Sequence, residues 1–280
     1  MNDLISPLPP GARILDLGCA KGSFAIERTD VLTIRVDREA FRPDDASCFV
    51  QSDAGSLPFA AEAFDLVVCN HSLEHFEDLD AVLGEVRRVV KPTGLLFVAV
   101  PASTSITDRI YRWLAKGGGH VNAFADPQPL VRKIEARTGL RHLGTKVLFS
   151  SLCFLNRRNL PSAPSKKMAL FLWGSERYLA IISYCFRTLD RTLGTRLSQY
   201  GWASFFGTPR GALLLDPWTN VCVRCGSGHC ADSLREGGRT RTVFWKLTAY
   251  TCPVCGARNL FTPDAWAPRV GLDGEFVSNS

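Results

Sequence analysis

The sequence predicts an α/β protein with a mainly parallel sheet, followed by a small metal-binding domain. Three observations carry this prediction. Short apolar strands alternate with helical segments over the first hundred residues, a glycine turn follows the first strand, and two Cys-x-x-Cys pairs lie near the C-terminus. The chain has 280 residues, of which 46% are hydrophobic and 21% charged, and this balance excludes a disordered or collagen-like protein.

Local signals place each element. Residues 13–17 (RILDL) form an apolar strand that ends at the glycine turn, and residues 23–29 are expected to form the next helix. Segment 126–139 carries helix signals at both ends, with Asp126 as the cap and Gly139 as the terminator. The remaining strands are expected at residues 31–37, 64–70, 95–101, 142–155 and 199–207. Further helices are expected at residues 79–91 and, as a long basic amphipathic stretch, 166–197.

The glycine turn is the most informative segment. Gly18 allows a ligand to approach the backbone, and Gly22 allows the following helix to begin close to the sheet, with free N–H groups at its start. The G-x-x-x-G spacing differs from the G-x-G-x-x-G of nicotinamide-binding turns. Asp16, two residues before the first glycine, can meet an ammonium group. The turn therefore favours a ligand with an amino-acid part over a pyrophosphate.

Two further carboxylates indicate the rest of that ligand. Asp37 ends the second strand, 19 residues after Gly18, where a carboxylate can accept hydrogen bonds from both ribose hydroxyls. Asp53 precedes an Ala-Gly turn and can accept from an adenine amino group. An amino acid, a ribose and an adenine together make up S-adenosylmethionine.

With these motifs in order, residues 12–101 and the HVNAF segment at 120–124 resemble the class I S-adenosylmethionine-dependent methyltransferases of the type 11 group. The matching stretches are ILDLGCAKG and the long segment from QSDAGSLPF to LLFVAVP. Ala20 stands where the family turn usually has glycine. The resemblance implies a Rossmann-like methyltransferase sheet that binds S-adenosylmethionine. The cofactor-binding residues that it implies are Asp16, Gly18, Cys19, Gly22, Asp37, Asp53, Ala54 and Asn70.

Three histidines are candidates for the chemistry. In the family, the loop after strand 64–70 lies beside the methyl group, so His71 and His75 are candidate catalytic bases. His120, in the loop after strand 95–101, is a candidate substrate-facing residue. Glu74–His75 also resembles the E-H pair with which ubiquinone-type O-methyltransferases help hold a divalent cation, although a Glu stands there in place of His71. The alternative for all three is a structural cap or brace.

A long basic and apolar insertion, about residues 156–198, is expected to cover the substrate as a helical cap. Residues 131–210 carry 14 Lys and Arg against 3 Asp and Glu, which favours an anionic partner. Its apolar stripe is expected to pack against the sheet, with contact to a lipid-like substrate or an anionic membrane surface as the alternative.

The last cysteines indicate a zinc site. Cys222 and Cys225 form one Cys-x-x-Cys pair, and Cys252 and Cys255 form another, each followed by glycine. Four thiolates make a closed tetrahedral site, so we expect a structural Zn²⁺ in a zinc ribbon, with strand at residues 240–251. His229 and Cys230 are left over as substitute ligands.

These inferences give one domain scheme and three functional hypotheses. The expected domains are a methyltransferase domain at 1–209, a zinc ribbon at 210–265 and a tail at 266–280. The leading hypothesis is methyl transfer to a small-molecule, lipid-linked or sugar-linked acceptor, with oxygen as the expected acceptor atom. The alternatives are an RNA methyltransferase that grips nucleic acid with the ribbon and the basic segment, and a cofactor-binding protein without turnover. The N-terminus has no signal-peptide pattern, so we expect a cytoplasmic protein, with peripheral membrane association as an option.

Overall fold

A computed structural model gives the fold. It describes residues 2–20, 22–24, 26, 28–40, 47–114, 119–156, 158–159, 175–208, 218–245, 247–263, 269–270 and 276–277. Residues 160–174 of the expected cap and most of the expected tail thus lie outside the described residues. Among the helices in the described part, none is long and apolar enough to cross a membrane.

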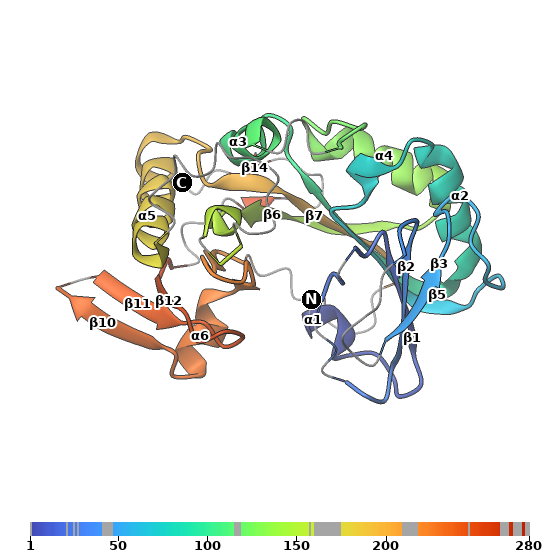
Figure 1. The fold of residues 1–280 in the computed structure, drawn as a ribbon, viewed down its shortest axis with the longest axis horizontal. Coiled ribbons are helices and arrows are strands. Elements are labelled where there is room, and N and C mark those ends of the chain that lie inside the picture. The colour runs from blue at the N-terminus through green and yellow to red at the C-terminus, as the bar shows by residue number, and fades with distance from the viewer. Residues whose placement is uncertain are drawn as a thin grey trace.

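The central feature is a seven-stranded sheet with the order β3-β2-β1-β4-β5-β7-β6 (Figure 1). Strands β1 to β5 are parallel, and β7 runs antiparallel to both of its neighbours. The strands are β1 (Arg13–Leu17), β2 (Leu32–Asp37), β3 (Cys48–Gln51), β4 (Phe64–Asn70), β5 (Val90–Pro101), β6 (His142–Phe149) and β7 (Gln199–Gly207). The expected α/β sheet is confirmed, and this order is that of Rossmann-like methyltransferases.

Side-chain alternation divides the core between the two faces of the sheet. On β1, Leu15 and Leu17 face one layer and Ile14 faces the other. The layer with Leu15 is covered by α2 (Leu79–Val89) and α4 (Pro127–Thr138), which lie on one side of the sheet in Figure 1. The opposite layer is covered by the segment around α1 (Asn2–Ile5). The helices that hold the sheet therefore lie mainly on one face.

The prediction of a helix at residues 23–29 is wrong for the residues that the structure describes there. Described residues of this segment form bends and turns on the way from β1 to β2. The physical reason is the buried side chain of Arg35, which reaches back from β2 and donates to the Phe24 carbonyl at 2.9 Å. Asp16 accepts from the Ser23 amide at 2.9 Å, so these contacts fix the backbone in a non-helical form. No helix N-terminus therefore follows the glycine turn in the described residues.

The carboxyl ends of β4 and β5 lead into two short elements at this edge of the sheet. A 3₁₀ turn, η1 (Leu73–His75), follows β4, and α3 (Ile106–Leu114) follows β5. The backbone of Glu74 accepts hydrogen bonds from the Val121 and Asn122 amides, which ties the loop before α4 to η1. Segments far apart in the sequence thus meet at one edge of the sheet.

The amphipathic helix of the expected cap packs differently from our expectation. Helix α5 (Glu176–Leu193) buries Leu179 and Ala180 against Val223 and Leu260 of the C-terminal domain, not against the central sheet. Its apolar pattern correctly predicted a buried face but could not identify the surface that covers it. A second 3₁₀ turn, η2 (Cys153–Leu155), contributes to the same cluster.

The C-terminal domain is a small β structure around the four cysteines. A three-stranded antiparallel sheet carries the second cysteine pair, and a two-stranded ladder flanks the first. Its elements are β8 (Asn220–Val221), β9 (Gly228–His229), α6 (Ala231–Glu236), β10 (Thr240–Phe244), β11 (Leu247–Thr251) and β12 (Arg258–Leu260). Strand at 240–251 is confirmed as a hairpin. Beyond it, β13 (Arg269–Val270) pairs with β14 (Phe276–Val277).

Candidate functional site

The glycine turn follows β1 directly and is held against the end of β2. The amides of Gly18 and Cys19 donate to the Val36 carbonyl at 2.8 and 3.1 Å. Gly18 has a φ of +68°, and a Cβ there would lie 2.5 Å from the Ser72 Cβ. Only glycine therefore satisfies both the conformation and the close approach. Burial raises the pKa of the Cys19 thiol to about 12, so this side chain stays neutral.

Asp37 connects the turn to the expected ribose position. One of its carboxylate oxygens accepts from the Ala20 amide at 2.8 Å, and the other accepts from the Glu39 amide at 3.0 Å. Ala20 has a φ of +43°, so alanine here adopts a left-handed conformation that suits the glycine usual in the family. Asp37 thus orders the turn and presents a carboxylate at the end of β2, as a ribose-binding acid requires.

Asp16 lies in a different environment from the one we expected. The side chain is fully buried and lies 3.7 Å from the Arg35 guanidinium. A Cβ on Gly22 would lie 2.4 Å from that guanidinium, so glycine at this position makes room for Arg35. Asp16 is therefore engaged by a cation of the protein itself. An ammonium group on a ligand would compete with Arg35 for this carboxylate.

The remaining cofactor candidates also lie near the carboxyl edge of the sheet. Asp53 follows β3 and accepts from the Gly55 amide at 2.7 Å, which closes a tight turn around the buried Ala54. Asn70 is the last residue of β4. Ligands of open α/β sheets bind at this edge, so the turn, Asp37 and the Asp53–Asn70 region fit an adenosyl group. The fit departs from the family in the Asp16–Arg35 pair and in the non-helical backbone of the described residues that follow the turn.

Two of the candidate histidines meet beside the glycine-turn edge. The ring centroids of His75 and His120 lie 4.9 Å apart, and His75 Nδ1 donates to the Gly119 carbonyl at 3.1 Å. His120 Nδ1 lies 3.8 Å from the buried carboxylate of Asp108. Burial lowers the pKa of His120, which favours the neutral imidazole that a general base needs.

A cavity of about 240 Å³ opens next to His120. The lining mixes an apolar wall with polar groups and includes Pro101, Asp108, Arg112, His120, Asn122 and Phe124. Arg112 is paired with Asp108 at 2.7 Å. The tilted ring of Tyr111 stacks against His120 with centroids 6.2 Å apart, so aromatic and charged groups converge at one place.

Glu74 links the third histidine to this group. Its carboxylate is buried, lies 3.7 Å from His71 Nδ1, and has one oxygen, Oε2, with no hydrogen-bond partner in the described structure. His71 has a φ of +54°, a strained conformation of the kind found at functional sites. Ligand atoms of Glu74, His75 and His120 all lie within 4.8 Å of one another. The structure therefore brings the three histidines to one acidic neighbourhood.

The sequence analysis missed Asp108 and Arg112, because no element was assigned to residues 102–125. A signal was present in the Ser105–Asp108 spacing, which matches a capping box. In the structure the Asp108 amide donates to the Ser105 hydroxyl at 3.0 Å and begins α3. Recognition of this cap would have placed the Asp108 carboxylate and the Arg112 guanidinium one helical turn apart on the same helix.

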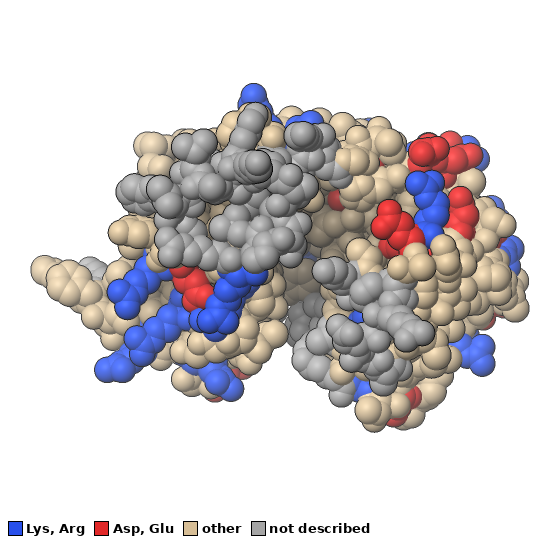
Figure 2. Space-filling view, viewed as in Figure 1, with Lys and Arg blue, Asp and Glu red and all other residues tan. Residues whose placement is uncertain are grey.

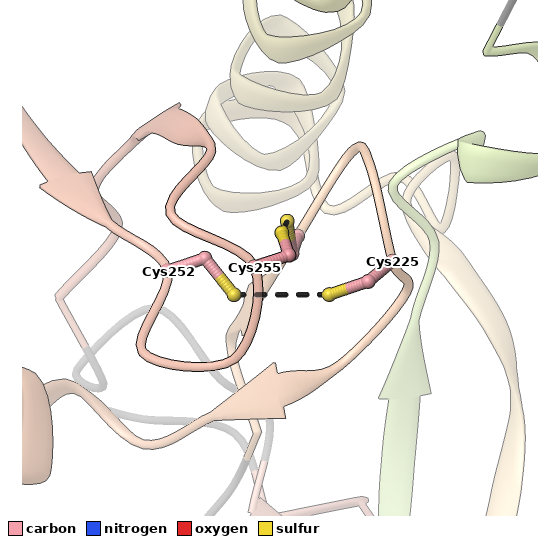
Figure 3. A group of neighbouring side chains, drawn as sticks. Cys225, Cys252 and Cys255 are labelled. Carbon is pink, nitrogen blue, oxygen red and sulfur yellow. Dashed lines mark hydrogen bonds between the residues drawn. The ribbon is translucent and has the colours of Figure 1, made fainter. Parts of the chain in front are cut away.

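The four cysteines predicted as zinc ligands converge at the start of the C-terminal domain. The Sγ atoms of Cys222 and Cys255 lie 3.6 Å apart. Those of Cys225 and Cys252 lie 3.7 Å apart and are joined by the dashed line in Figure 3. Four sulfurs about 2.3 Å from a tetrahedral zinc are separated by about 3.8 Å. The sulfur geometry therefore fits Zn²⁺ closely. His229, one of the spare residues, lies 3.5 Å from the Cys252 sulfur through its Nε2 atom.

The two cysteine turns have the same backbone hydrogen bonds. Gly226 donates to Cys222 and Gly256 to Cys252, both at 2.9 Å, and both glycines have a positive φ near 70°. The Asn259 side-chain amide also lies 3.6 Å from the Cys222 sulfur. Donors around a sulfur stabilise a thiolate, as a metal ligand requires.

The C-terminal domain is joined to the rest of the chain by specific polar contacts. Ser151 donates to the Cys222 carbonyl at 2.9 Å, and Asn156 donates to the Val223 carbonyl at 3.1 Å. Arg224 makes two bonds to the Glu176 carboxylate, at 2.6 and 2.8 Å. The first cysteine turn is therefore bound to the segment beside η2 and to the start of α5.

Comparison with known proteins agrees with this geometry. Residues 15–98 match the family model of the methyltransferase domain Methyltransf_11. The chain is 31% identical over 143 residues to a malonyl-acyl-carrier-protein O-methyltransferase of Methylococcus capsulatus, covering 46% of this chain and 52% of that protein. It is 30% identical over 156 residues to a ubiquinone biosynthesis O-methyltransferase of Sinorhizobium fredii, covering 48% and 63%.

The chain thus spans about half to two thirds of the length of these curated relatives. Among solved structures, the (4+2) cyclase SpnF is 21% identical, covers 73% of this chain and 77% of its own, and gives a TM-score of 0.47. The family match covers β1 to β5 and the residues that hold the glycine turn. On the sequence match and the strand order together, residues 15–98 match the Methyltransf_11 methyltransferase domain, within a sheet that has the strand order of class I S-adenosylmethionine-dependent methyltransferases.

Proposed function

We propose that the chain transfers a methyl group from S-adenosylmethionine to an oxygen of a small-molecule, lipid-linked or sugar-linked acceptor. The observation that carries this proposal is the cavity beside His120, at the same sheet edge as the glycine turn. The names of three relatives support oxygen as the acceptor atom, because they are O-methyltransferases acting on malonyl-acyl-carrier protein, in ubiquinone biosynthesis and on a demethylrifamycin.

The chemistry needs little from the protein beyond position and a base. The sulfonium cofactor supplies an activated methyl group when it is bound. Asp37 and the Gly18 turn would hold the nucleoside end of the cofactor, and the cavity would orient the acceptor hydroxyl. His120, whose pKa is lowered by burial, would take the hydroxyl proton, and the Asp108 carboxylate 3.8 Å away would stabilise the resulting imidazolium.

The same side chains also have the donor types for a divalent cation. Glu74 supplies a buried oxygen without a partner, and His75 and His120 supply ring nitrogens within 4.8 Å of it. A chelator separates the two roles. Activity that survives exhaustive EDTA treatment, with the ribbon zinc content unchanged, supports His120 as a base, whereas loss and recovery with Mg²⁺ or Mn²⁺ supports a cation at this place.

For the second cluster we propose a structural zinc ribbon. Cys222, Cys225, Cys252 and Cys255 would hold Zn²⁺ with all four positions taken by sulfur. Such a site has no open position for substrate or water, so its contribution is to the stability of the domain.

The direct test of the methyltransferase proposal uses methyl-labelled S-adenosylmethionine with the full chain and an extract of the source organism. Label is counted in the organic, small-solute, protein and RNA fractions. Label in the organic or small-solute fraction is the expected result. Label in RNA would replace the proposal with RNA methylation, and cofactor binding without label in any fraction would indicate a binding protein without turnover.

A further inference from the structure

The hairpin of β10 and β11 ends in an apolar tip. Val243, Phe244 and Trp245 follow one another there and are 51%, 75% and 83% exposed. Single exposed apolar residues are ordinary on a protein surface, but three consecutive large ones at a convex tip indicate an interaction site. Neither the methyl-transfer site nor the four-cysteine cluster uses these side chains.

The tip projects from the body of the protein. Figure 1 shows β10 and β11 extending past α5, away from the central sheet, and Figure 2 shows the same end as a protrusion at the left edge of the molecule. The base of the hairpin is fixed, because Tyr250 of β11 is buried and β12 pairs with β11 beside the second cysteine turn. A rigid base lowers the entropy lost when the tip binds.

The charge around the tip has one sign. Residues 237–263 contain four basic residues and no acidic residue. Arg239, Arg241 and Arg258 are exposed on the described part of this segment. Arg241 precedes Phe244 by three residues, which corresponds to about 10 Å along an extended strand. The aromatic tip thus ends a segment whose charged residues are all basic.

We propose that this hairpin docks onto an anionic membrane surface. Phe244 and Trp245 enter the boundary between headgroups and acyl chains, where amphipathic aromatic rings are favoured, and Arg239 and Arg241 meet lipid phosphates. An insertion depth of about 5–10 Å is typical of interfacial segments and matches the spacing between the rings and the arginines. The proposal does not depend on methyl transfer.

The shape of the tip favours a bilayer over nucleic acid. Proteins that bind single strands stack bases on aromatics inside a positively charged groove that follows the backbone. Here the aromatics lie at a convex end together with the aliphatic Val243, which has no ring to stack on a base. A soft, laterally continuous surface accepts such a tip, whereas a nucleic-acid strand would contact only one side of it.

The test is sedimentation of the zinc-loaded full chain with sucrose-loaded vesicles of phosphatidylcholine alone or with one third phosphatidylglycerol. We expect binding to the anionic vesicles only, weakening as salt is raised. The double variant Phe244→Ser/Trp245→Ser should bind at least about tenfold more weakly, because it removes most of the buried apolar area. Replacement of Arg239 and Arg241 by Gln should weaken binding about fivefold for each charge removed.

A matched control removes two exposed leucines elsewhere. Leu189→Ser/Leu193→Ser on α5 should bind like the parent, and zinc content and melting temperature confirm that every variant is folded. Equal binding of the parent and the tip variant would overturn the proposal. Failure of the parent to bind anionic vesicles would also overturn it, as would tip-dependent binding of an RNA oligomer or tip-dependent dimerisation in light scattering without vesicle binding.

Discussion

The glycine turn and the four-cysteine cluster are both short glycine-containing motifs, yet the structure surrounds them very differently. The two cysteine turns are alike in their hydrogen bonds and bring four sulfurs to one point. The glycine turn keeps its left-handed Gly18 and its contact with Asp37, but the residues that the structure describes after it, 22–24, 26 and 28–29, are not helical. Each cysteine turn is held by a hydrogen bond between its own residues, so its sequence determines its backbone conformation. The backbone after the glycine turn is held by the side chain of Arg35 on β2, so the sequence of the turn does not determine it.

The largest expected effect is loss of zinc in a cysteine variant, which should unfold the C-terminal domain and leave cofactor binding intact. Cys252→Ser removes one of four ligands, and structural zinc sites contribute on the order of 10 kcal/mol to folding. We therefore expect loss of zinc by elemental analysis and rapid hydrogen exchange across residues 218–263. Cofactor binding should change little, because Asp37 and the glycine turn lie in the other domain.

The contacts of Ser151, Asn156 and Glu176 with the first cysteine turn determine how far this unfolding spreads. We expect the start of α5 to lose protection as well. Collapse of cofactor binding in the same variant would mean that the two regions are one folding unit and that the boundary at residue 209 is wrong.

A substitution at His120, beside the cavity, should lower the rate of methyl transfer strongly but the stability of the protein only slightly. His120→Gln should lower kcat roughly 100-fold at unchanged cofactor affinity, since it removes the proposed base. Burial lowers the pKa of His120, so the parent should lose activity only as the pH falls below the ordinary imidazole value of 6.5.

A control for this prediction is His142→Gln on β6. Burial lowers the pKa of His142 too, but its ring bonds to Thr145, away from the cavity. Its pH–rate profile should match that of the parent. An unchanged profile in the His120 variant would exclude this residue as the base.

A smaller effect is expected at the ribose position. Asp37→Ala should weaken S-adenosylmethionine binding roughly 10- to 100-fold, the range for hydrogen bonds to a charged group. Calorimetric titration measures this change. Glu39→Ala, which alters an exposed neighbour and keeps the Asp37 carboxylate, should bind like the parent. Equal affinity of Asp37→Ala and the parent would remove Asp37 from the cofactor site.

The smallest expected effects are on the free energy of unfolding, from substitutions at one positive-φ residue in each motif. Ala20→Gly should raise the free energy of unfolding by about 1 kcal/mol, because glycine adopts a positive φ without strain. Gly256→Ala should lower it by a similar amount, since the added Cβ meets open space and only the φ of +71° opposes it. Denaturant titrations measure both. The same sign for both variants would contradict the backbone argument.

The sequence predicted most of what local patterns determine. Strands β4 and β7 lie at the expected residues, and α4 begins after Asp126 and ends before Gly139 as its signals indicated. The short strand β3 was missed because its four residues carry no clear alternation. The packing of α5 against Val223 could not be predicted. An apolar helix face indicates that the face is buried, but it does not identify the residues that bury it.

The site was predicted at the level of motifs rather than partners. Spacing alone predicted that the four cysteines form one group, Asp37 was predicted from its place at the end of the second strand, and the resemblance pointed to the histidine loop. It did not show that Arg35 pairs with Asp16, since these residues meet only after β1 and β2 are side by side. Nor did it show that Asp108 faces His120, because that contact joins helix α3 to the loop before α4 through the fold.

The most direct measurement of the central claim is calorimetric titration of S-adenosylmethionine into the zinc-loaded full chain. The account predicts one site per chain and much weaker binding in Asp37→Ala. An Arg35→Met variant measured alongside should show whether the Asp16 carboxylate is open to the cofactor ammonium group once the guanidinium is removed. No detectable binding in the folded parent protein would contradict the assignment of this sheet edge as a methyl-donor site.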